Sequence, residues 1–195
     1  EDALGQNAAA LAQAEGLPCA WQVCPDTATG NAAIWLNDEG QNQILVDLAA
    51  NHHLSVAYIQ AHAESIHGAR VLLIQQEASL DASLEALCIA KAAGVLCIVN
   101  PAPANAKAGE LHTMADVLTP NESEFAALLH AHGETLSADF IEQCDADTLH
   151  ALARKLLCQN VVITLGARGA ILSTPGGFRT FPAPKVRVVD STGAG

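Results

Sequence analysis

A glycine-rich turn, Asp190 to Gly195 (DSTGAG), follows the apolar run Val188-Val189 near the end of the sequence. Glycine lets a backbone approach a ligand closely, and the free N–H groups where a helix begins can hold an anion. Serine and threonine add hydroxyl donors. This turn therefore predicts a segment that holds phosphate groups at the end of a strand.

Similar polar or glycine-rich segments follow other short apolar runs of the chain. They are Gln76-Glu77, Asn100 to Ala104, Pro120 to Glu124 and Gly166 to Gly169. Each of them alone has a simpler interpretation, because Gly and Pro occur in any loop and Asn caps any helix. Their occurrence in series favours one site, since ligands bind open parallel sheets at the carboxyl ends of the strands.

The elements that carry these segments alternate from residue 55 onward. The expected helices cover 55–66, 80–93, 121–131 and 146–157, and the expected strands cover 70–75, 95–99, 116–119 and 161–165. Short apolar strands that alternate with amphipathic helices indicate an α/β fold with a parallel sheet covered on both faces.

The remaining segments do not follow this alternation of helices and strands. An Ala-rich helix is expected over 3–15, and short strands over 20–24, 30–36 and 42–48, with a hairpin turn at Asn37 to Gly40. Residues 170–189 resemble an antiparallel hairpin, and the polar, acidic stretch 132–147 is expected to be a surface excursion.

Composition limits the kinds of function. Half of the residues are apolar and the formal net charge is −12, which disfavours nucleic-acid binding but allows ATP, which arrives with Mg²⁺. The N-terminus has no signal-peptide pattern and no apolar run has membrane-spanning length. The six cysteines form no C-x-x-C pair, so we expect buried, reduced thiols in a cytoplasmic protein.

Other kinds of site find weaker support. His130-x-His132 and His52-His53 could chelate a metal, but no carboxylate or Cys stands at the usual ligand spacing, which favours surface histidines. Gly166 to Gly169 does not match G-x-G-x-x-G, so a Rossmann oxidoreductase is disfavoured, and no Walker A or G-x-S-x-G motif occurs.

Several motifs together resemble the ribokinase, or PfkB-type, family of carbohydrate kinases. The matching stretches are EDALGQ (1–6), TATGNAAIWLNDEGQNQILVDLAAN (27–51), NPAPA (100–104), TPNESE (119–124), VVITLGARGA (161–170) and VVDSTGAG (188–195). The resemblance implies a three-layer, ribokinase-like sandwich in which residues 1–195 form part of one kinase domain and residues 20–50 form a β-lid.

The resemblance also implies roles for individual residues. Asn121 and Glu124 match an N-x-x-E motif that organises Mg²⁺ through water, with Asn121 also near the nucleotide; the alternative is that Asn121 simply caps the following helix. The positions expected to contact ATP are Asn121, Thr164, Gly166, Ala167 and Gly169. Those expected to contact the sugar are Glu77 and Ala32.

The C-terminal turn carries two further expectations. Gly193, Ala194 and Gly195 match the anion hole that stabilises the transferred phosphoryl group. Asp190 and Thr192 match positions near a site for a monovalent cation, K⁺ being the expected ion.

The expected activity is ATP-dependent phosphorylation of a small sugar, with D-ribose converted to ribose 5-phosphate. In the family, a catalytic aspartate directly follows the Gly-Ala-Gly turn and a sugar-binding loop precedes the position of Glu1. We therefore expect residues 1–195 to be an internal part of a kinase that is inactive alone. The alternatives are a fructokinase, ketodeoxygluconate kinase or nucleoside kinase, or a non-catalytic nucleotide- or sugar-binding remnant. A homodimer formed through the β-lid is also expected.

Overall fold

The computed structural model describes residues 2–37 and 42–186. Its helices are α1 (Ala3–Ala14), α2 (Val56–Ala61), α3 (Ala63–His67), α4 (Leu80–Ala92), α5 (Gly109–Met114), α6 (Glu122–Ala131), α7 (Ala138–Gln143) and α8 (Ala146–Ala153). Its strands are β1 (Asn31–Leu36), β2 (Asn42–Asp47), β3 (Val71–Ile74), β4 (Leu96–Val99), β5 (Val117–Leu118), β6 (Asn160–Thr164), β7 (Ala170–Thr174) and β8 (Gly177–Phe181). Short 3₁₀ helices cover Ala49–His53, Ala106–Ala108 and Gly166–Arg168.

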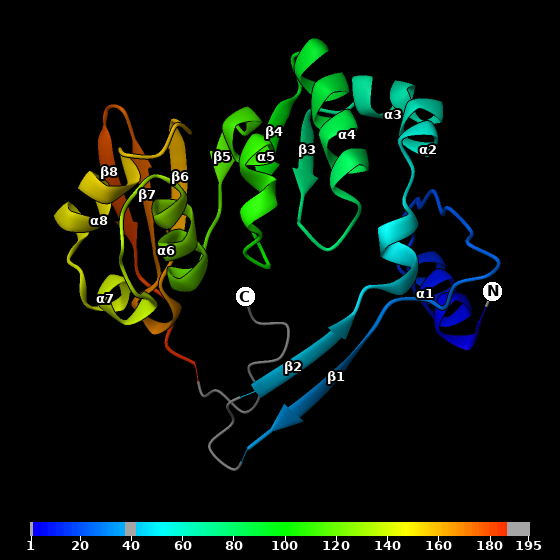
Figure 1. Ribbon diagram of the computed structural model, residues 1–195, viewed down its shortest axis with the longest axis horizontal. Coiled ribbons are helices and arrows are strands. Elements are labelled where there is room, and N and C mark those ends of the chain that lie inside the picture. The colour runs from blue at the N-terminus through cyan, green and yellow to red at the C-terminus, as the bar shows by residue number, and fades with distance from the viewer. Residues whose placement is uncertain (1, 38–41, 187–195) are drawn as a thin grey trace.

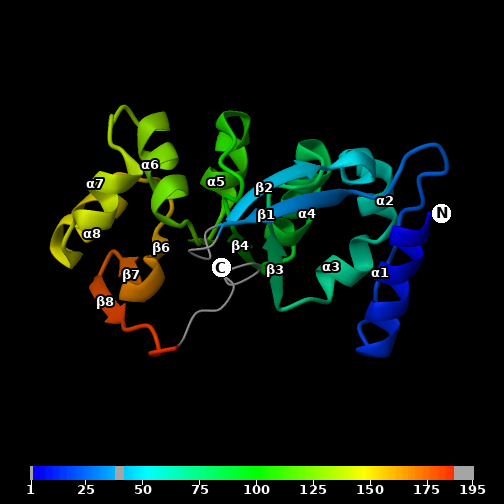
Figure 2. The same ribbon diagram turned by 90° about the horizontal axis from the view of Figure 1, so that it is seen from below.

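The main sheet has six strands in sequential order, β3-β4-β5-β6-β7-β8. β3 to β6 are parallel, and β7 and β8 are added as an antiparallel hairpin. Because parallel crossovers are right-handed and these strands are added in one direction, the connecting helices lie on one face. Figures 1 and 2 show α4, α5, α6 and α8 on that common face. The expected α/β fold with a mostly parallel sheet is confirmed.

The core lies between the sheet and this helical layer. Its largest fully buried side chains include Phe125 of α6, Leu87 of α4 and Ile163 of β6. The opposite face of the sheet is apolar as well, but Leu73 and Val71 are 67% and 46% exposed. Among the described residues, helices therefore cover one face of the sheet and not both.

β1 and β2 form a separate antiparallel hairpin, which we call the lid. Ile34 and Ile44 are paired on one face, Ala33 and Leu45 on the other, and Ile34, Ile44 and Leu45 are all more than 40% exposed. Figure 1 shows the lid standing away from the main sheet. An apolar hairpin exposed on both faces has no core of its own, so its stability depends on what it contacts.

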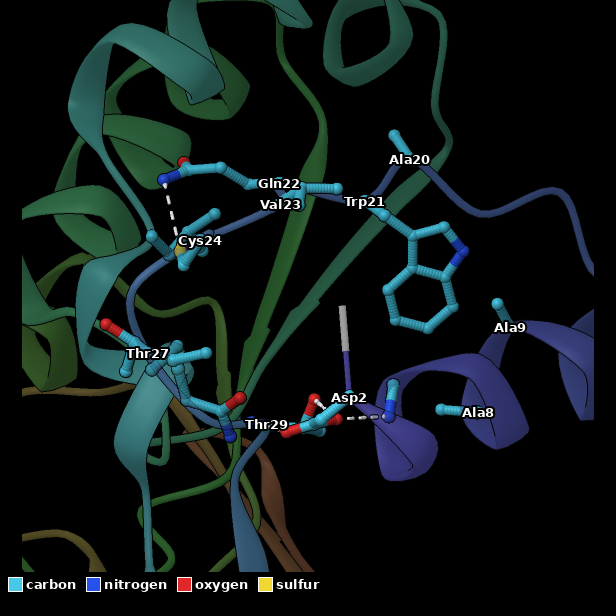
Figure 3. Close-up of a pocket in the computed structure, with 15 residues that line it drawn as sticks. Asp2, Ala8, Ala9, Ala20, Trp21, Gln22, Val23, Cys24, Thr27 and Thr29 are labelled. Atoms are coloured by element: carbon cyan, nitrogen blue, oxygen red, sulfur yellow. Dashed lines mark hydrogen bonds between the residues drawn. The ribbon is translucent and has the colours of Figure 1, made fainter.

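A carboxylate clamp fixes α1 to the base of the lid (Figure 3). Asp2 accepts hydrogen bonds from the N–H of Gly5 at 2.9 Å, the N–H of Thr29 at 2.7 Å and the Thr29 hydroxyl at 2.7 Å. A Cβ on Gly5 would lie 2.8 Å from Thr29 Oγ1, so a larger residue there would have to displace the Thr29 hydroxyl from the clamp. The bonds from Gly5 and then Thr29 lower the pKa of Asp2 to about 2.

Several expected boundaries are wrong. Residues 20–24 form no strand, and Gln22 instead uses its side chain to bond His53 and Ser55. The helix expected over 55–66 is divided at His62 into α2 and α3, and the helix expected over 146–157 ends at Ala153. α5 was not predicted, and the expected turn at Asn37 to Gly40 falls mostly outside the described residues.

The prediction of a surface excursion over 132–147 holds only in part, because most of these residues are exposed but two are buried. This stretch contains α7, whose Ile141 is fully buried, and it ends near the buried Cys144. The cysteine prediction holds only in part: Cys97, Cys144 and Cys158 are buried, whereas Cys19 and Cys88 are exposed. All six cysteines are free thiols.

The Asp2 clamp predicts a pH dependence. A carboxylate whose folded pKa is about 2 and whose ordinary pKa is 3.8 stabilises the fold above pH 4, and this contribution disappears as pH falls through 2. We expect Asp2→Asn to lower the unfolding midpoint at pH 5, and the difference from wild type to shrink toward pH 2. Urea unfolding at several pH values measures this. Asp26→Asn, at an exposed turn, is the control, and a gap that stays constant with pH would contradict the clamp.

Candidate active site at the carboxyl edge of the sheet

The loops that follow β3, β4, β5 and β6 lie side by side at one edge of the sheet. Backbone hydrogen bonds join each loop to the neighbouring strand or loop. They run from Asn100 N to Ile74 O (2.8 Å), Gln76 N to Ala102 O (2.9 Å), Thr119 N to Val99 O (3.1 Å) and Thr164 N to Pro120 O (2.9 Å). The structure thus brings the four described strand-end segments together, because consecutive parallel strands end at the same edge.

At the β3 and β4 ends, two side-chain oxygens are buried without a partner among the described residues: Oε1 of Gln76 and Oδ1 of Asn100. Gln76 is 8% exposed, and its Nε2 lies 2.5 Å from Nε2 of His112 on α5. A buried acceptor without a donor is costly, and both oxygens are closed to solvent. The sequence places both residues after strands, but only the fold reveals these unpaired acceptors.

His112 links this polar group to a cavity of about 530 Å³ between the 101–109 loop, α5 and α6. Burial, and then the charge of His132, lower the pKa of His112 below its ordinary value, which favours the neutral ring. Glu124 also lines this cavity, whose remaining wall is largely apolar. No sequence signal marks His112, because α5 itself was not predicted.

The N-x-x-E motif forms a complete capping box at the start of α6. Asn121 Oδ1 accepts from Glu124 N at 2.9 Å, and Glu124 Oε2 accepts from Asn121 N at 2.9 Å. Glu124 Oε1 also accepts from Asn121 Nδ2 at 3.1 Å. Burial raises the pKa of Glu124, although the bond from the Asn121 N–H opposes this. The capping alternative is therefore real, and it holds the Glu124 carboxylate in one position at the site edge.

The loop after β6 is a single tight turn. Gly166 and Gly169 have φ of 50° and 92°, which favour glycine, and Leu165 N donates to Gly169 O at 2.8 Å. A Cβ on Gly169 would lie 1.9 Å from Phe181 O, so the loop contacts the end of β8 directly. Thr164 and Ala167 are exposed beside it. The turn therefore presents a glycine-lined, accessible backbone surface.

The predicted sugar-contacting residues lie on different elements. Glu77 follows β3 and is partly buried, with its N–H bonded to Gln75 Oε1 at 2.7 Å, whereas Ala32 lies exposed on β1 of the lid. The 3₁₀ helix Ala49–His53, which follows the lid, contacts the loop after β3: Ser79 N donates to Asn51 O at 3.2 Å. Asp190, Thr192, Gly193, Ala194 and Gly195 lie outside the described residues.

Metal-ligand clusters and membrane-spanning helices are absent from the described residues. Within residues 2–37 and 42–186, no group of three or more His, Cys, Asp or Glu side chains is arranged to hold a metal ion. No helix in the same ranges is long and apolar enough to span a membrane. A cavity of about 280 Å³ beside the Asp2 clamp, shown in Figure 3, is lined by none of the predicted site residues.

Comparison with known proteins agrees with this arrangement. The chain is 39% identical to mouse ribokinase over 180 residues, an alignment that covers 87% of this chain and 51% of that protein. Ribokinase from Giardia lamblia superposes on the whole chain with a TM-score of 0.85 at 26% identity, and 60% of that chain is covered. Arabidopsis thaliana ribokinase, solved with ribose and ATP, superposes on 87% of this chain and 53% of its own, with a TM-score of 0.67 at 25% identity.

The chain thus spans about half the length of the curated ribokinases it matches. The sequence model for the pfkB family of carbohydrate kinases matches residues 1–195, which is the entire chain. With the sheet, the lid and the ordered series of strand-end loops in agreement, the chain belongs to the pfkB carbohydrate kinase family.

Proposed function

We propose that the whole protein containing these residues transfers the γ-phosphoryl group of ATP to a primary hydroxyl of a pentose, with D-ribose as the substrate. The observation that carries this proposal is the row of bonded strand-end loops at one sheet edge, from Gln76 to Gly169. Phosphoryl transfer needs positioning and charge neutralisation more than covalent chemistry, and such an edge can provide both.

The nucleotide end of the proposed site is formed by the loops after β5 and β6. Thr164 and the backbone of Gly166, Ala167 and Gly169 are proposed to lie along ATP, because this turn exposes backbone without large side chains. The turn 193–195 is proposed to receive the transferred phosphoryl group through its N–H groups. The Arabidopsis relative, solved with ribose and ATP, supports both ligands.

The residues at the start of α6 suit Mg²⁺ bound through water. Both Glu124 oxygens already accept hydrogen bonds, but each has a further lone pair, and an ionised carboxylate attracts a hydrated cation. Asn121 and Glu124 would therefore orient metal-bound water. When bound, Mg²⁺ would neutralise charge on the phosphates. Asp190 and Thr192 are proposed to lie near a monovalent-cation site for K⁺.

The sugar end is proposed to lie at the β3 and β4 ends beneath the lid. Glu77 is partly exposed and can accept hydrogen bonds from sugar hydroxyls, whereas the unpaired oxygens of Gln76 and Asn100 lie beneath this surface, closed to solvent. Ala32 and Ile34 share one apolar face of the lid, which can cover the sugar and exclude water. The other face, with Ala33 and Leu45, is proposed to pair with a second copy of the chain.

Substrate choice is tested by coupled ADP release from the whole protein with ribose, fructose, ketodeoxygluconate and adenosine. We expect the largest kcat/KM with ribose. Glu77→Ala should lower kcat/KM for ribose by about 10- to 100-fold, the value of a hydrogen bond to a charged group, and leave KM for ATP within about twofold.

Glu110→Ala, at an exposed position of α5, is the matched control and should change neither constant. A larger kcat/KM with another substrate would contradict ribose as the substrate but keep the kinase activity. No ADP release with any substrate would favour a non-catalytic nucleotide- or sugar-binding protein.

Asn121 separates the capping role from the nucleotide role. Asn121→Ala removes the N-cap acceptor and should cost about 1 kcal/mol of unfolding free energy, whereas Asn121→Ser keeps an acceptor and should cost only a few tenths. If the amide also orients water around MgATP, both variants raise KM for MgATP by about tenfold. A serine variant with unchanged stability and unchanged KM would reduce Asn121 to a helix cap.

A further inference from the structure

The loop Gly166 to Gly169 is tied to a helix that the family motifs do not include. Nη1 of Arg168 donates to Cys144 O at 2.8 Å, and Nη2 donates to Ile141 O at 3.4 Å. Both carbonyls belong to the carboxyl end of α7, where the last C=O groups of a helix lack intrahelical partners. A guanidinium presents a planar fork that suits two adjacent carbonyl oxygens.

We call these two hydrogen bonds the Arg168 tether. The two carbonyl groups of α7 that accept them are firmly held. Ile141 is fully buried and Cys144 is 7% exposed, so their backbone positions are set by the core. Cys144 N also donates to Ile141 O at 3.2 Å, which closes the end of the helix. α7 packs closely against α6, the helix that Asn121 caps. The carbonyls that Arg168 contacts are thus connected to the N-x-x-E motif through packed structure.

The opposite side of the loop is held too. Gly169 lies directly against the backbone of Phe181 to Ala183, as the 1.9 Å distance from its ideal Cβ to Phe181 O shows. The loop is therefore fixed from the β8 side by contact and from the α7 side by Arg168. Between these contacts only Ala167 and Gly166 face solvent with no large side chain.

We propose that Arg168 is a positioning residue for the nucleotide, which holds the turn Gly166–Gly169 in its ligand-ready shape by fastening it to the carboxyl end of α7. This inference rests on the proposed function, because it assigns the turn to ATP. The guanidinium is engaged with α7, so Arg168 acts through the loop backbone and not as a phosphate ligand. α7 is accordingly part of the nucleotide site's support.

Because Arg168 is exposed, its effect on nucleotide binding can be measured separately from any effect on the stability of the whole fold. Hydrogen bonds and charges at an exposed side chain contribute little to global stability. Loss of the tether should instead make the turn Gly166–Gly169 mobile. Nucleotide binding would then have to order the turn, and the cost of this ordering lowers the affinity for ATP. KM for ATP should rise without a matching fall in the unfolding midpoint.

The test compares Arg168→Ala, Arg168→Lys and Arg154→Ala in the whole protein. Arg154 is the matched control, since it donates from the C-cap position of α8 to Ser173 of β7, through Nε at 3.1 Å and Nη2 at 3.3 Å. We expect Arg168→Ala to raise KM for ATP by about 5- to 20-fold with KM for the sugar unchanged. Arg168→Lys should recover part of this, and Arg154→Ala should lower the melting temperature but leave KM for ATP unchanged.

A variant of α7 tests whether this helix affects nucleotide binding through the Arg168 tether. Ser137→Ala removes the N-cap of α7, where Ser137 Oγ accepts from Phe140 N at 3.2 Å, and touches neither Arg168 nor the turn. It should also raise KM for ATP, by a smaller factor. Amide hydrogen exchange without nucleotide should be faster at Leu165, Arg168 and Gly169 in Arg168→Ala than in wild type.

The outcomes are distinguishable. Wild-type activity with unchanged KM for ATP in Arg168→Ala would overturn this inference alone, as would equal increases of KM for ATP and sugar. Unchanged exchange at the turn would overturn the tether whatever the activity. A wild-type protein that neither binds nor turns over ATP would overturn the proposed function, and with it the nucleotide role of Arg168.

Discussion

The parallel pairing of β3, β4, β5 and β6 is the constraint on which the rest of the molecule depends. Because these strands run the same way, each connection must return across one face, which produces the helical layer. The same geometry sends all four strand ends to one edge. There the loop backbones bond each other in sequence, from Asn100 N on Ile74 O to Thr164 N on Pro120 O. Backbone pairing therefore brings together groups that are far apart in the chain.

What this edge can do follows from how its polar groups are satisfied. The Asn121–Glu124 pair is fully bonded within its capping box, so its carboxylate is fixed before any ligand arrives. The Gln76 and Asn100 oxygens are buried and have no hydrogen-bond donor among the described residues. The turn at Gly166 offers accessible backbone, and its shape is held by Arg168 and by the end of β8. Prepositioned charge and an open turn suit a reaction that depends on positioning.

Much of this could be predicted from the sequence, and the failures have physical causes. The periodicity of apolar residues predicted β3, β4, β6, α4 and α6 because each buries one face in the same core. Residues 20–24 had the composition of a strand, but a strand needs a partner and none of the described residues supplies one. The 132–147 stretch looked like a surface excursion because its few apolar residues are widely spaced. Burial of Ile141 depends on packing against α6, which is a tertiary effect.

The candidate site shows the same division. Asn121, Glu124 and the glycines after β6 could be located from motif and spacing, because a helix cap and a tight turn are local. The Gln76–His112 contact and the Arg168 tether could not, since each joins segments more than twenty residues apart. The terminal turn and its Gly193 to Gly195 remain a prediction outside the described residues.

The most direct test of the account is amide hydrogen exchange of the whole protein with and without Mg²⁺ and a non-hydrolysable ATP analogue. Slower exchange concentrated at 119–124 and 165–169 is the predicted result, whereas protection confined to the cavity beside Asp2, or none at the sheet edge, would contradict it.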